Sequence, residues 1–422
     1  MIDALLNERD QHAYRFILNV LGSSVPFHKI RPTLLSKTFR EIARIEEIEN
    51  SARDKWGNWD WQFTEAQRNG TLYRPTLDRE IMKLRRDVRK PAPISLWPGG
   101  KKFALCLTHD VDFVSLLALS PKAARQAFMG KIKANISPFK KAVELIRLGG
   151  QFALQPVRLA GKDDPLWKFE KWLELESLFG FHSTFFFFPA PGPFVHEWDC
   201  SYRLSDMVKY GRKKMSVAKM MNEIDLAGWE IGLHGSYHSA LNQDLLSIEK
   251  REVEDAIGKR IVSTRQHYLH YDVRQTPKNQ EQAGFACDSS QGFNRSIGFR
   301  AATSFPYVCW NHKEGRPLSI LEIPQHIMDG GLFTENALEY NTDLAIQHSI
   351  RLMDEVESVG GCLTLSWHPH NIVHEKWWDV YKTILEEAHH RDAWGSSAGE
   401  VYNYWTKRQK MILDTFTIKS KK

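Results

Sequence analysis

Short apolar segments alternate with longer amphipathic segments from about residue 102 to the end of the chain. Short segments rich in β-branched and aromatic residues indicate strands, and apolar residues repeated at helical spacing indicate helices. The predicted strands are 102–108, 183–188, 229–233, 262–268, 284–288, 300–305, 318–323 and 362–367. The predicted helices are 166–180, 214–227, 244–260, 336–358, 375–391 and 397–409. This alternation predicts an α/β fold with a largely parallel sheet or barrel.

The first 95 residues do not follow this pattern. They contain a tryptophan cluster, Trp56, Trp59 and Trp61, and lead into a proline-containing connector at 90–98. The chain has 422 residues and is 42% hydrophobic, which is enough for one large domain with an accessory piece. We therefore predict an N-terminal accessory region over 1–95 and a main domain over 96–422.

A long insertion, 113–165, follows the first predicted strand. Its 121–162 segment interleaves apolar residues at roughly helical spacing with nine basic residues and a single acid, Glu144. The basic residues are Lys122, Arg125, Lys131, Lys133, Lys140, Lys141, Arg147, Arg158 and Lys162. A basic amphipathic segment can lie peripherally on an anionic membrane surface. The alternative, which we favour, is a helical hairpin that packs on the domain and exposes its basic face to solvent.

Charge, cysteine content and the start of the chain bear on partners and location. With 57 basic and 51 acidic residues the net charge is +6, too balanced to indicate nucleic-acid binding. The cysteines lack any C-x-x-C spacing and are odd in number, which favours a reducing compartment over a disulfide framework. They are Cys106, Cys200, Cys287, Cys309 and Cys362. No basic, apolar signal segment and no 18-residue apolar run occurs, so we expect a cytoplasmic protein.

Acidic and histidine side chains gather where three of the predicted strands end. The first strand runs into His109-Asp110-Val111-Asp112, and the period of two along a strand sends Asp110 and Asp112 to the same side. Two carboxylates on one side need a cation, or one of them must take a proton. A turn with hydrated acids would also explain this motif taken alone.

The second strand end carries His234-Gly235-Ser236-Tyr237-His238. Two imidazoles four residues apart can turn toward one ion, and with a carboxylate they would leave an open position for water. The third strand end carries His368-Pro369-His370. Ligands gather at the carboxyl ends of strands in α/β folds, so the three motifs together predict a metal-binding active site.

These motifs resemble the polysaccharide deacetylase superfamily, the family 4 carbohydrate esterases with a NodB-type homology domain, in the subset whose first motif reads H-D-V-D. The resemblance covers about residues 100–400 and implies an irregular (β/α) barrel of about seven strands. It also implies a divalent metal, zinc first, with cobalt, nickel, manganese and iron as alternatives. In that family the first motif supplies a base and a metal ligand, which implies Asp110 as the base and Asp112 as a ligand. His234 and His238 would be the remaining ligands.

The later motifs of the family can also be recognised. Arg265-Gln266-His267-Tyr268 resembles the motif R-x-P-Y with His267 in place of proline. The resemblance implies that Arg265 orients Asp110 and that the main-chain N–H of Tyr268 stabilises the oxyanion. It further implies that Asp288 pairs with the catalytic histidine, which corresponds to His368.

Four other residues are candidate substrate contacts. By resemblance, Leu365 and Trp367 would contact the acyl methyl group. His267 and His370 are near enough in sequence to line the pocket, but each could equally be a hydrogen-bonded loop residue.

The function implied by the resemblance is metal-dependent removal of an N-acyl group, acetyl first, from an amino sugar. With a cytoplasmic location the substrate would be a nucleotide-linked, lipid-linked or free amino sugar, or a polysaccharide. Two alternatives stay open at this point: an amidase acting on a small non-sugar C–N bond, and a non-catalytic glycan-binding module. The sequence does not indicate an oligomeric state.

Overall fold

The structure is a computed structural model of the chain and describes residues 6–23, 25–85, 94–115, 142, 164–190, 196 and 198–419. Nearly all of the insertion predicted at 113–165, including the basic 121–162 segment except residue 142, lies outside the described residues. Both interpretations of that segment, the favoured packed helical hairpin and the alternative membrane contact, therefore stay predictions. None of the described helices is both long enough and apolar enough to span a membrane.

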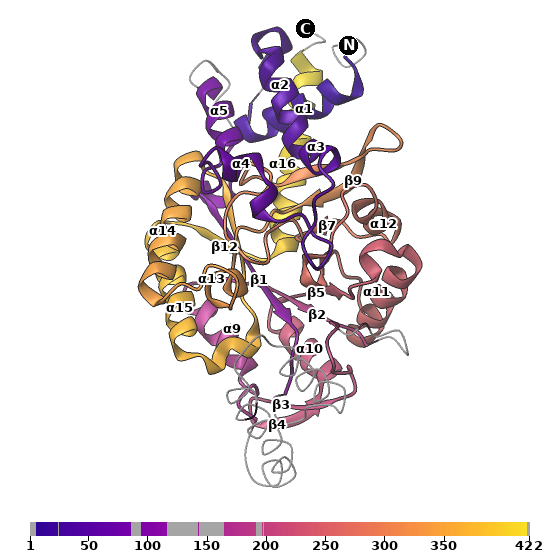
Figure 1. Ribbon diagram of the computed structural model, residues 1–422, viewed down its shortest axis with the longest axis vertical. Coiled ribbons are helices and arrows are strands. Elements are labelled where there is room, and N and C mark those ends of the chain that lie inside the picture. The colour runs from indigo at the N-terminus through magenta and orange to yellow at the C-terminus, as the bar shows by residue number, and fades with distance from the viewer. Residues whose placement is uncertain are drawn as a thin grey trace.

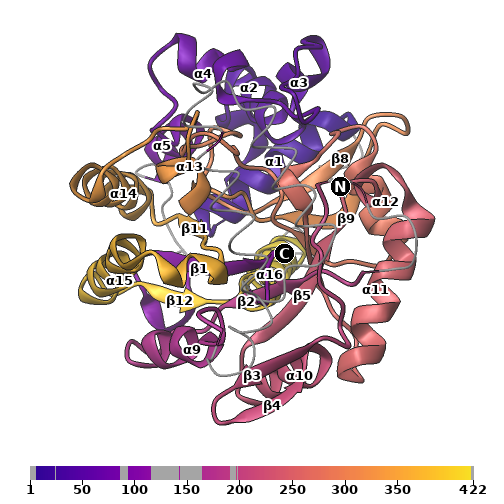
Figure 2. The ribbon, with the colours of Figure 1, turned by 60° about the horizontal axis from the view of Figure 1, so that its bottom comes forward.

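A strongly curled sheet forms the centre of the molecule (Figures 1 and 2). In spatial order its strands are β10 (Ile327–Met328), β11 (Cys362–Ser366), β1 (Ala104–Val111), β2 (Thr184–Phe187), β5 (Glu230–Gly235), β6 (Ser263–Gln266), β7 (Cys287–Asp288), β9 (Arg316–Glu322) and β8 (Tyr307–Asn311). A tenth strand, β12 (Trp394–Ser396), also pairs with β1. Among the described strands of this sheet only β8 and β9 pair antiparallel, and β8 and β10 do not pair with each other. The sheet is thus an incomplete, mostly parallel barrel, which confirms the predicted fold class.

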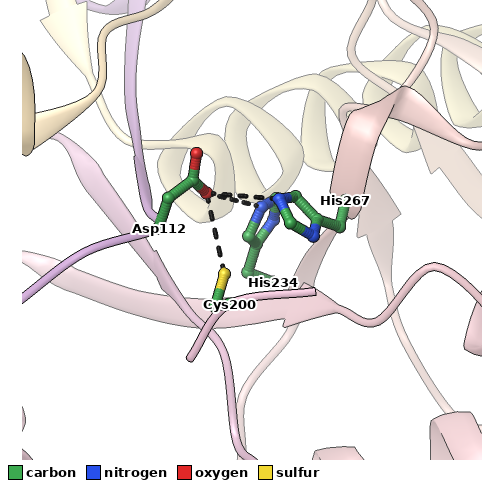
Figure 3. Close-up of side chains that lie close together, drawn as sticks. All are labelled: Asp112, Cys200, His234 and His267. Atoms are coloured by element: carbon green, nitrogen blue, oxygen red, sulfur yellow. Dashed lines mark hydrogen bonds and ion pairs between the residues drawn. The ribbon is translucent and has the colours of Figure 1, made fainter. Parts of the chain in front are cut away.

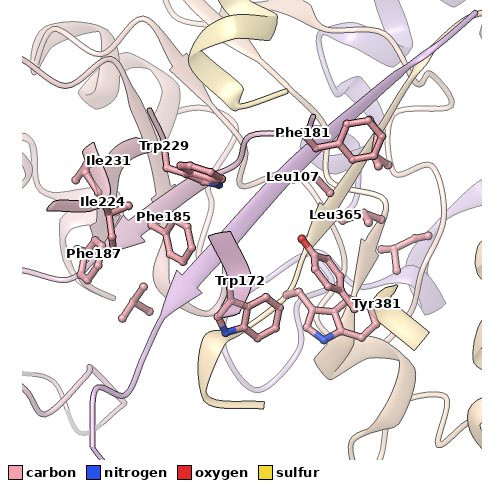
Figure 4. Packing of buried hydrophobic residues seen from close by; sticks show 14 of the residues in the cluster. Leu107, Trp172, Phe181, Phe185, Phe187, Ile224, Trp229, Ile231, Leu365 and Tyr381 are labelled. Carbon is pink, nitrogen blue, oxygen red and sulfur yellow. The ribbon is translucent and has the colours of Figure 1, made fainter. Parts of the chain in front are cut away.

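Helices surround the outer face of the sheet (Figure 2). They are α9 (Phe169–Ser177), α10 (Val217–Leu226), α11 (Gln243–Ile257), α12 (Thr276–Gln282), α14 (Thr342–Val359) and α15 (Glu375–His390). Strand side chains of one parity, such as Leu107, Phe185 and Leu365, pack with Trp172 of α9 and Tyr381 of α15 in one buried cluster (Figure 4). Burying both faces of the strands explains why they are almost continuously apolar.

The last helix, α16 (Ala398–Lys419), packs into the barrel from one end (Figure 2). Its residues Val401 and Trp405 belong to a cluster that includes Cys106 and Phe186, residues of the opposite strand parity from the outer cluster. At its first turn the backbone N–H of Gly399 donates to Oε2 of Glu230 in β5, at 2.7 Å. A carboxylate at a helix N-terminus is stabilised by the exposed N–H groups there. The interior is therefore filled at this end of the barrel.

The N-terminal region packs across the open side of the barrel (Figure 1). It contains α1 (Glu8–Leu21), α2 (Pro32–Ile42), α3 (Ile45–Glu49), α4 (Glu65–Arg68) and α5 (Thr76–Leu84). Helix α2 contacts β8, α1 contacts β9 and α16, and α5 contacts α14, so the region bridges both sides of the gap. Its apolar side chains, among them Ile17 and Leu34, share a cluster with Trp97 and Trp405. The first 95 residues and the barrel therefore share one hydrophobic core.

The strand predicted at 300–305 is wrong. Ala302 has a positive φ of 53°, and its carbonyl accepts a hydrogen bond from the backbone N–H of Leu77 in α5, at 3.0 Å. Thr303 and Ser304 donate to the buried carboxyl of Asp78, also in α5. The segment is apolar because the N-terminal region covers it, and β8 begins only at Tyr307. Elements not predicted are β8, β10, β12, α12, α13 (Asp329–Phe333), the hairpin β3 (Met207–Tyr210) and β4 (Lys213–Ser216), and the N-terminal helices.

The Asp78 contact generates a prediction about stability and pH. Burial raises the pKa of Asp78 to about 7 from 3.8, although hydrogen bonds from Thr303 and Ser304 act in the opposite direction. Between these two values the folded state holds more protons than the unfolded state, so the free energy of unfolding should fall as pH rises. Asp78→Asn cannot ionise and should lose this dependence. The free energy of unfolding of Asp78→Asn minus that of wild type should be about 3 kcal/mol more positive at pH 8 than at pH 5.

Urea unfolding at the two pH values measures this difference. Asp343→Asn, at an exposed position in the first turn of α14, is the matched control and should show no change with pH. An Asp78→Asn difference that is the same at pH 5 and pH 8 would contradict the proposed burial penalty.

Candidate metal centre

The carboxyl ends of four parallel strands bring the predicted motifs to one edge of the barrel. Asp110 lies in β1 with Asp112 just beyond it, His234 lies in β5, and His267 and His368 follow β6 and β11. Parallel strands end at the same edge of a sheet, so side chains far apart in sequence meet there.

Four side chains at this edge form a group of metal donors (Figure 3). One donor atom from each of Asp112, Cys200, His234 and His267 lies within 4.8 Å of the others. From Oδ1 of Asp112, the distances are 3.3 Å to Nε2 of His234, 3.6 Å to Nε2 of His267 and 3.8 Å to Sγ of Cys200. A carboxylate, two imidazoles and a thiol are donors that zinc and related divalent metals accept.

The surroundings of His234 fit a bound cation. Its Nδ1 lies 3.1 Å from the main-chain oxygen of Arg265, which orients the ring. Its buried Nε2 makes no hydrogen bond within the described residues beyond the 3.3 Å ion-pair contact with Oδ1 of Asp112. A buried polar atom is rarely left without a partner, and a metal ion would provide one.

The carboxylates and imidazoles also shift one another's pKa values. Burial acts to raise the pKa of Asp112, but His368, His234 and His267 lower it below its usual range. Burial acts to lower the pKa of His234, but Asp110 and Asp112 raise it overall. The acids and imidazoles therefore favour one another's charged forms, and a divalent cation at this position would likewise favour the ionised carboxylates.

The structure does not place His238, a predicted ligand, in this group. Its side chain is exposed and lies against His196 and Tyr237, with ring centroids 4.7 and 5.7 Å apart. Residues four apart share a face in a helix, but His234 belongs to strand β5 and His238 to the turn after it. The backbone N–H of Tyr237 donates a hydrogen bond to Oδ1 of Asp199 at 2.7 Å, which fixes the backbone conformation of that turn.

His267 lies where the second imidazole was expected. It was predicted as a substrate contact, but its ring lies 4.8 Å from that of His234, centroid to centroid. Its Nδ1 lies 3.5 Å from Oδ1 of Asp199, the neighbour of Cys200. Burial acts to raise the pKa of Asp199, but His267 and the N–H of Tyr237 lower it overall. No motif marks Asp199 or Cys200 in the sequence.

Asp110 lies beside the donor group but is not part of it. Nε of Arg265 lies 3.4 Å from Oδ1 of Asp110, and that oxygen has no hydrogen-bond partner among the described residues. Arg265 is fully buried, and its Nη2 donates to the hydroxyls of Thr108 and Ser289 at 2.8 and 3.0 Å. Arg265 is thus placed to orient Asp110.

His368 lies on the other side of Asp112 and is held by Asp329. The ring Nδ1 lies 2.6 Å from Oδ1 of Asp329, and the backbone N–H of His368 donates to Oδ2 at 2.8 Å. Its Nε2 lies 3.6 Å from Oδ2 of Asp112. Burial acts to lower the pKa of His368, but Asp329 and Asp112 raise it to about 10.

The predicted partner of His368, Asp288, lies elsewhere. It ends β7 and is paired in register with Glu322 of β9, and its carboxyl accepts a hydrogen bond from the Ser290 hydroxyl at 2.6 Å. Asp329 replaces it because β10, which directly precedes Asp329, is the neighbour of β11, which precedes His368. In the sequence, the only signal for Asp329 was an acid directly after a short apolar segment. That segment forms β10, whose two residues are too few to identify a strand from sequence.

Three further expectations concern the residues around His368. Leu365 and Trp367, expected to contact the acyl group, are fully buried in the helix-facing cluster, because the period of two turns them away from the barrel interior. His370 packs against His368 and Phe113, at centroid distances of 5.3 and 5.0 Å. Burial and then His368 lower the pKa of His370 to about 4. None of the three lines the cavity described next.

A cavity of about 210 Å³ opens onto the site. It is lined by Trp56, Asp110, Asp112, His234, His267, Tyr268, Leu269, Asn294, Arg295, Met328, Thr334, Glu335 and His368. Tyr268 has a positive φ of 55°, a strained conformation that is often found at functional sites. Asn58 and Asn294 hold it there by donating to its carbonyl, at 2.7 and 2.6 Å. Metal donors, Asp110 and His368 therefore face one small cavity.

No protein-family model matches the sequence, and no curated protein sequence matches it. A solved protein assigned as a polysaccharide deacetylase from Mycobacterium smegmatis is similar, with a TM-score of 0.48 and 19% identity over 76% of this chain and 96% of that chain. An allantoinase has a TM-score of 0.43 and 15% identity, over 75% and 94%. A protein assigned as a polysaccharide deacetylase from Pseudomonas aeruginosa has a TM-score of 0.44 and 15% identity, over 75% and 95%. At such low identity the activity has to be inferred from the site itself.

The donor group generates a prediction that separates His267 from His238. His267→Ala should weaken Zn²⁺ binding by at least about 100-fold, since even the loss of a group that only orients a ligand costs 10- to 100-fold. His238→Ala, the matched control, should bind Zn²⁺ as wild type does. Competition with a chelator of known affinity measures both values. Loss of affinity in His238→Ala with retention in His267→Ala would reverse the assignment.

Proposed function

We propose that this chain is a metal-dependent hydrolase that removes an N-acyl group, acetyl in the first instance, from an amino sugar. The observation that carries the proposal is that one cavity is lined by metal donors, by a carboxylate outside the donor group and by a histidine paired with an acid. Hydrolysis of an amide needs an activated water, stabilisation of the oxyanion and a proton for the departing nitrogen. The described residues can supply each of these.

Asp110 is the proposed base. A divalent metal, when bound, supplies Lewis acidity and makes water more acidic. Asp110 accepts a proton from the attacking water, since its Oδ1 has no other hydrogen-bond partner among the described residues. Arg265 orients this carboxylate, and its guanidinium is itself held by hydrogen bonds to the hydroxyls of Thr108 and Ser289.

His368 is the proposed acid. Its Nδ1 is occupied by Asp329, so Nε2 is the atom that can donate a proton to the departing nitrogen. Tyr268 supplies a main-chain N–H for the oxyanion in this proposal. Asn58 and Asn294 donate to the Tyr268 carbonyl, which belongs to the next peptide, and so fix the backbone of Tyr268 beside this N–H.

The size of the cavity supports a small substrate. A volume of about 210 Å³ is below the range usual for drug-sized ligands and suits a single ring. A nucleotide-linked, lipid-linked or free amino sugar would present one such ring with its acyl group. Zinc as the metal and the cytoplasm as the location remain predictions.

The first test is acetate release by the metal-loaded protein from a panel of N-acetylated sugars and small cyclic amides. Asp110→Asn should lower kcat by about 10²- to 10⁴-fold, because general-base catalysis contributes that much. It should keep its metal, since Asp110 lies outside the donor group. Asp112→Asn should lose both metal and activity.

Asp343→Asn, at an exposed position that does not line the cavity, is the control and should keep wild-type activity. Full activity in Asp110→Asn, or no acetate release from any sugar by the metal-loaded wild type, would contradict the proposal. Release from cyclic amides alone would favour the small-amide alternative.

A further inference from the structure

A segment of the N-terminal region, Asp54–Asp60, reaches the edge of the cavity. Asn58 is buried and makes two contacts with the loop after β6: its Nδ2 donates to the carbonyl of Tyr268 at 2.7 Å, and its Oδ1 accepts from the N–H of Tyr271 at 3.3 Å. The main-chain oxygen of Trp56 accepts a hydrogen bond from the Tyr237 hydroxyl at 2.8 Å. The segment is therefore fastened to the loops that follow both β5 and β6.

Trp56 itself lines the cavity. Its ring stacks on that of Tyr268, with centroids 5.8 Å apart and planes at 25°. The two rings form an aromatic wall in a cavity whose other described walls are largely polar or titratable. Trp56 is only partly buried, and the Nζ of the exposed Lys55 lies 4.3 Å from its ring centre, so a sugar would bind the ring beside this lysine or displace its side chain.

Polar groups border this aromatic wall. Arg295 lines the cavity, forms an ion pair with Asp60 and lies with its guanidinium carbon 5.9 Å from the centre of the Trp56 ring. Its Nε has no hydrogen-bond partner among the described residues. Asn294 and Glu335 line the same cavity. An apolar flat surface beside hydrogen-bonding groups matches a sugar ring, which has apolar C–H faces and hydroxyls at its rim.

We propose that Asp54–Asp60 is the outer wall of the substrate pocket and that Trp56 determines specificity by binding one sugar ring of the substrate. This inference rests on the proposed function for the location of the reacting group. It assigns to the N-terminal region a direct part in binding, in addition to covering the open side of the barrel. The competing interpretation is that Trp56 only supports Tyr268, in which case ring recognition would not depend on it.

The test compares binding of N-acetylglucosamine with binding of a ringless acetamide, N-acetylethanolamine, to the full-length zinc-loaded protein by calorimetry. Trp56→Leu keeps apolar bulk but removes the aromatic face, and should weaken sugar binding by about tenfold. Trp56→Phe should stay within about threefold of wild type. Neither change should alter binding of the ringless probe.

Trp61→Leu is the matched control, because Trp61 belongs to the same region but packs against the cluster of Trp59, Leu72 and Phe293 and does not line the cavity. Its sugar affinity should equal that of wild type. Zinc content and the midpoint of thermal unfolding check that each variant is folded.

Sugar affinity unchanged in Trp56→Leu, equal losses for sugar and ringless probe, or no sugar binding by wild type would each overturn the inference. The proposed function can fail separately. A wild type that binds the sugar through Trp56 and releases no acetate would contradict hydrolysis while leaving ring binding supported.

Discussion

The site depends on two carboxylates at the end of one strand, the buried Asp110 and the partly buried Asp112. Taking such charges out of water is costly unless opposite charge and hydrogen bonds surround them. The barrel provides this from strands on both sides of β1: Arg265 from β6, His234 from β5 and His368 from beyond β11. A metal ion bound to the donor group would compensate the remaining negative charge near Asp112. The same compensation leaves Asp110 outside the donor group, as its proposed role as base requires.

The incomplete barrel explains why the N-terminal region matters. A sheet that does not close leaves apolar interior side chains exposed on its open side. Helices α1, α2 and α5 cover them by packing against β9, β8 and α14 respectively. The buried ion pair between Glu47 and Arg300, at 2.7 Å, fastens this cover to the loop before β8. Because the cover continues toward the carboxyl ends of the strands, residues near Trp56 reach the cavity. Structural closure and the outer wall of the pocket therefore come from one stretch of chain.

Much of the barrel could be predicted because strand and helix periodicities are local properties. Seven predicted strands correspond to β1, β2, β5, β6, β7, β9 and β11, and all six predicted helices are present. Segments whose apolar character serves a non-local purpose were misread, as at 300–305, where the loop is apolar because α5 covers it. In the site, Asp110, Asp112, His234, Arg265, Tyr268 and His368 line or adjoin the cavity as expected. His238, Asp288, Leu365 and Trp367 do not.

What the sequence determined by itself was the set of strand ends that carry acids and imidazoles, since a strand and the residues after it are contiguous. Which of those side chains meet was decided by the tertiary structure. His267 joins His234 and His238 does not, because a turn rather than a helix follows β5. Asp329 holds His368 and Asp288 does not, because strand order makes β10 the neighbour of β11. Cys200 reaches the donor group and Trp56 reaches the cavity only because segments distant in sequence pack together, which no local sequence pattern indicates.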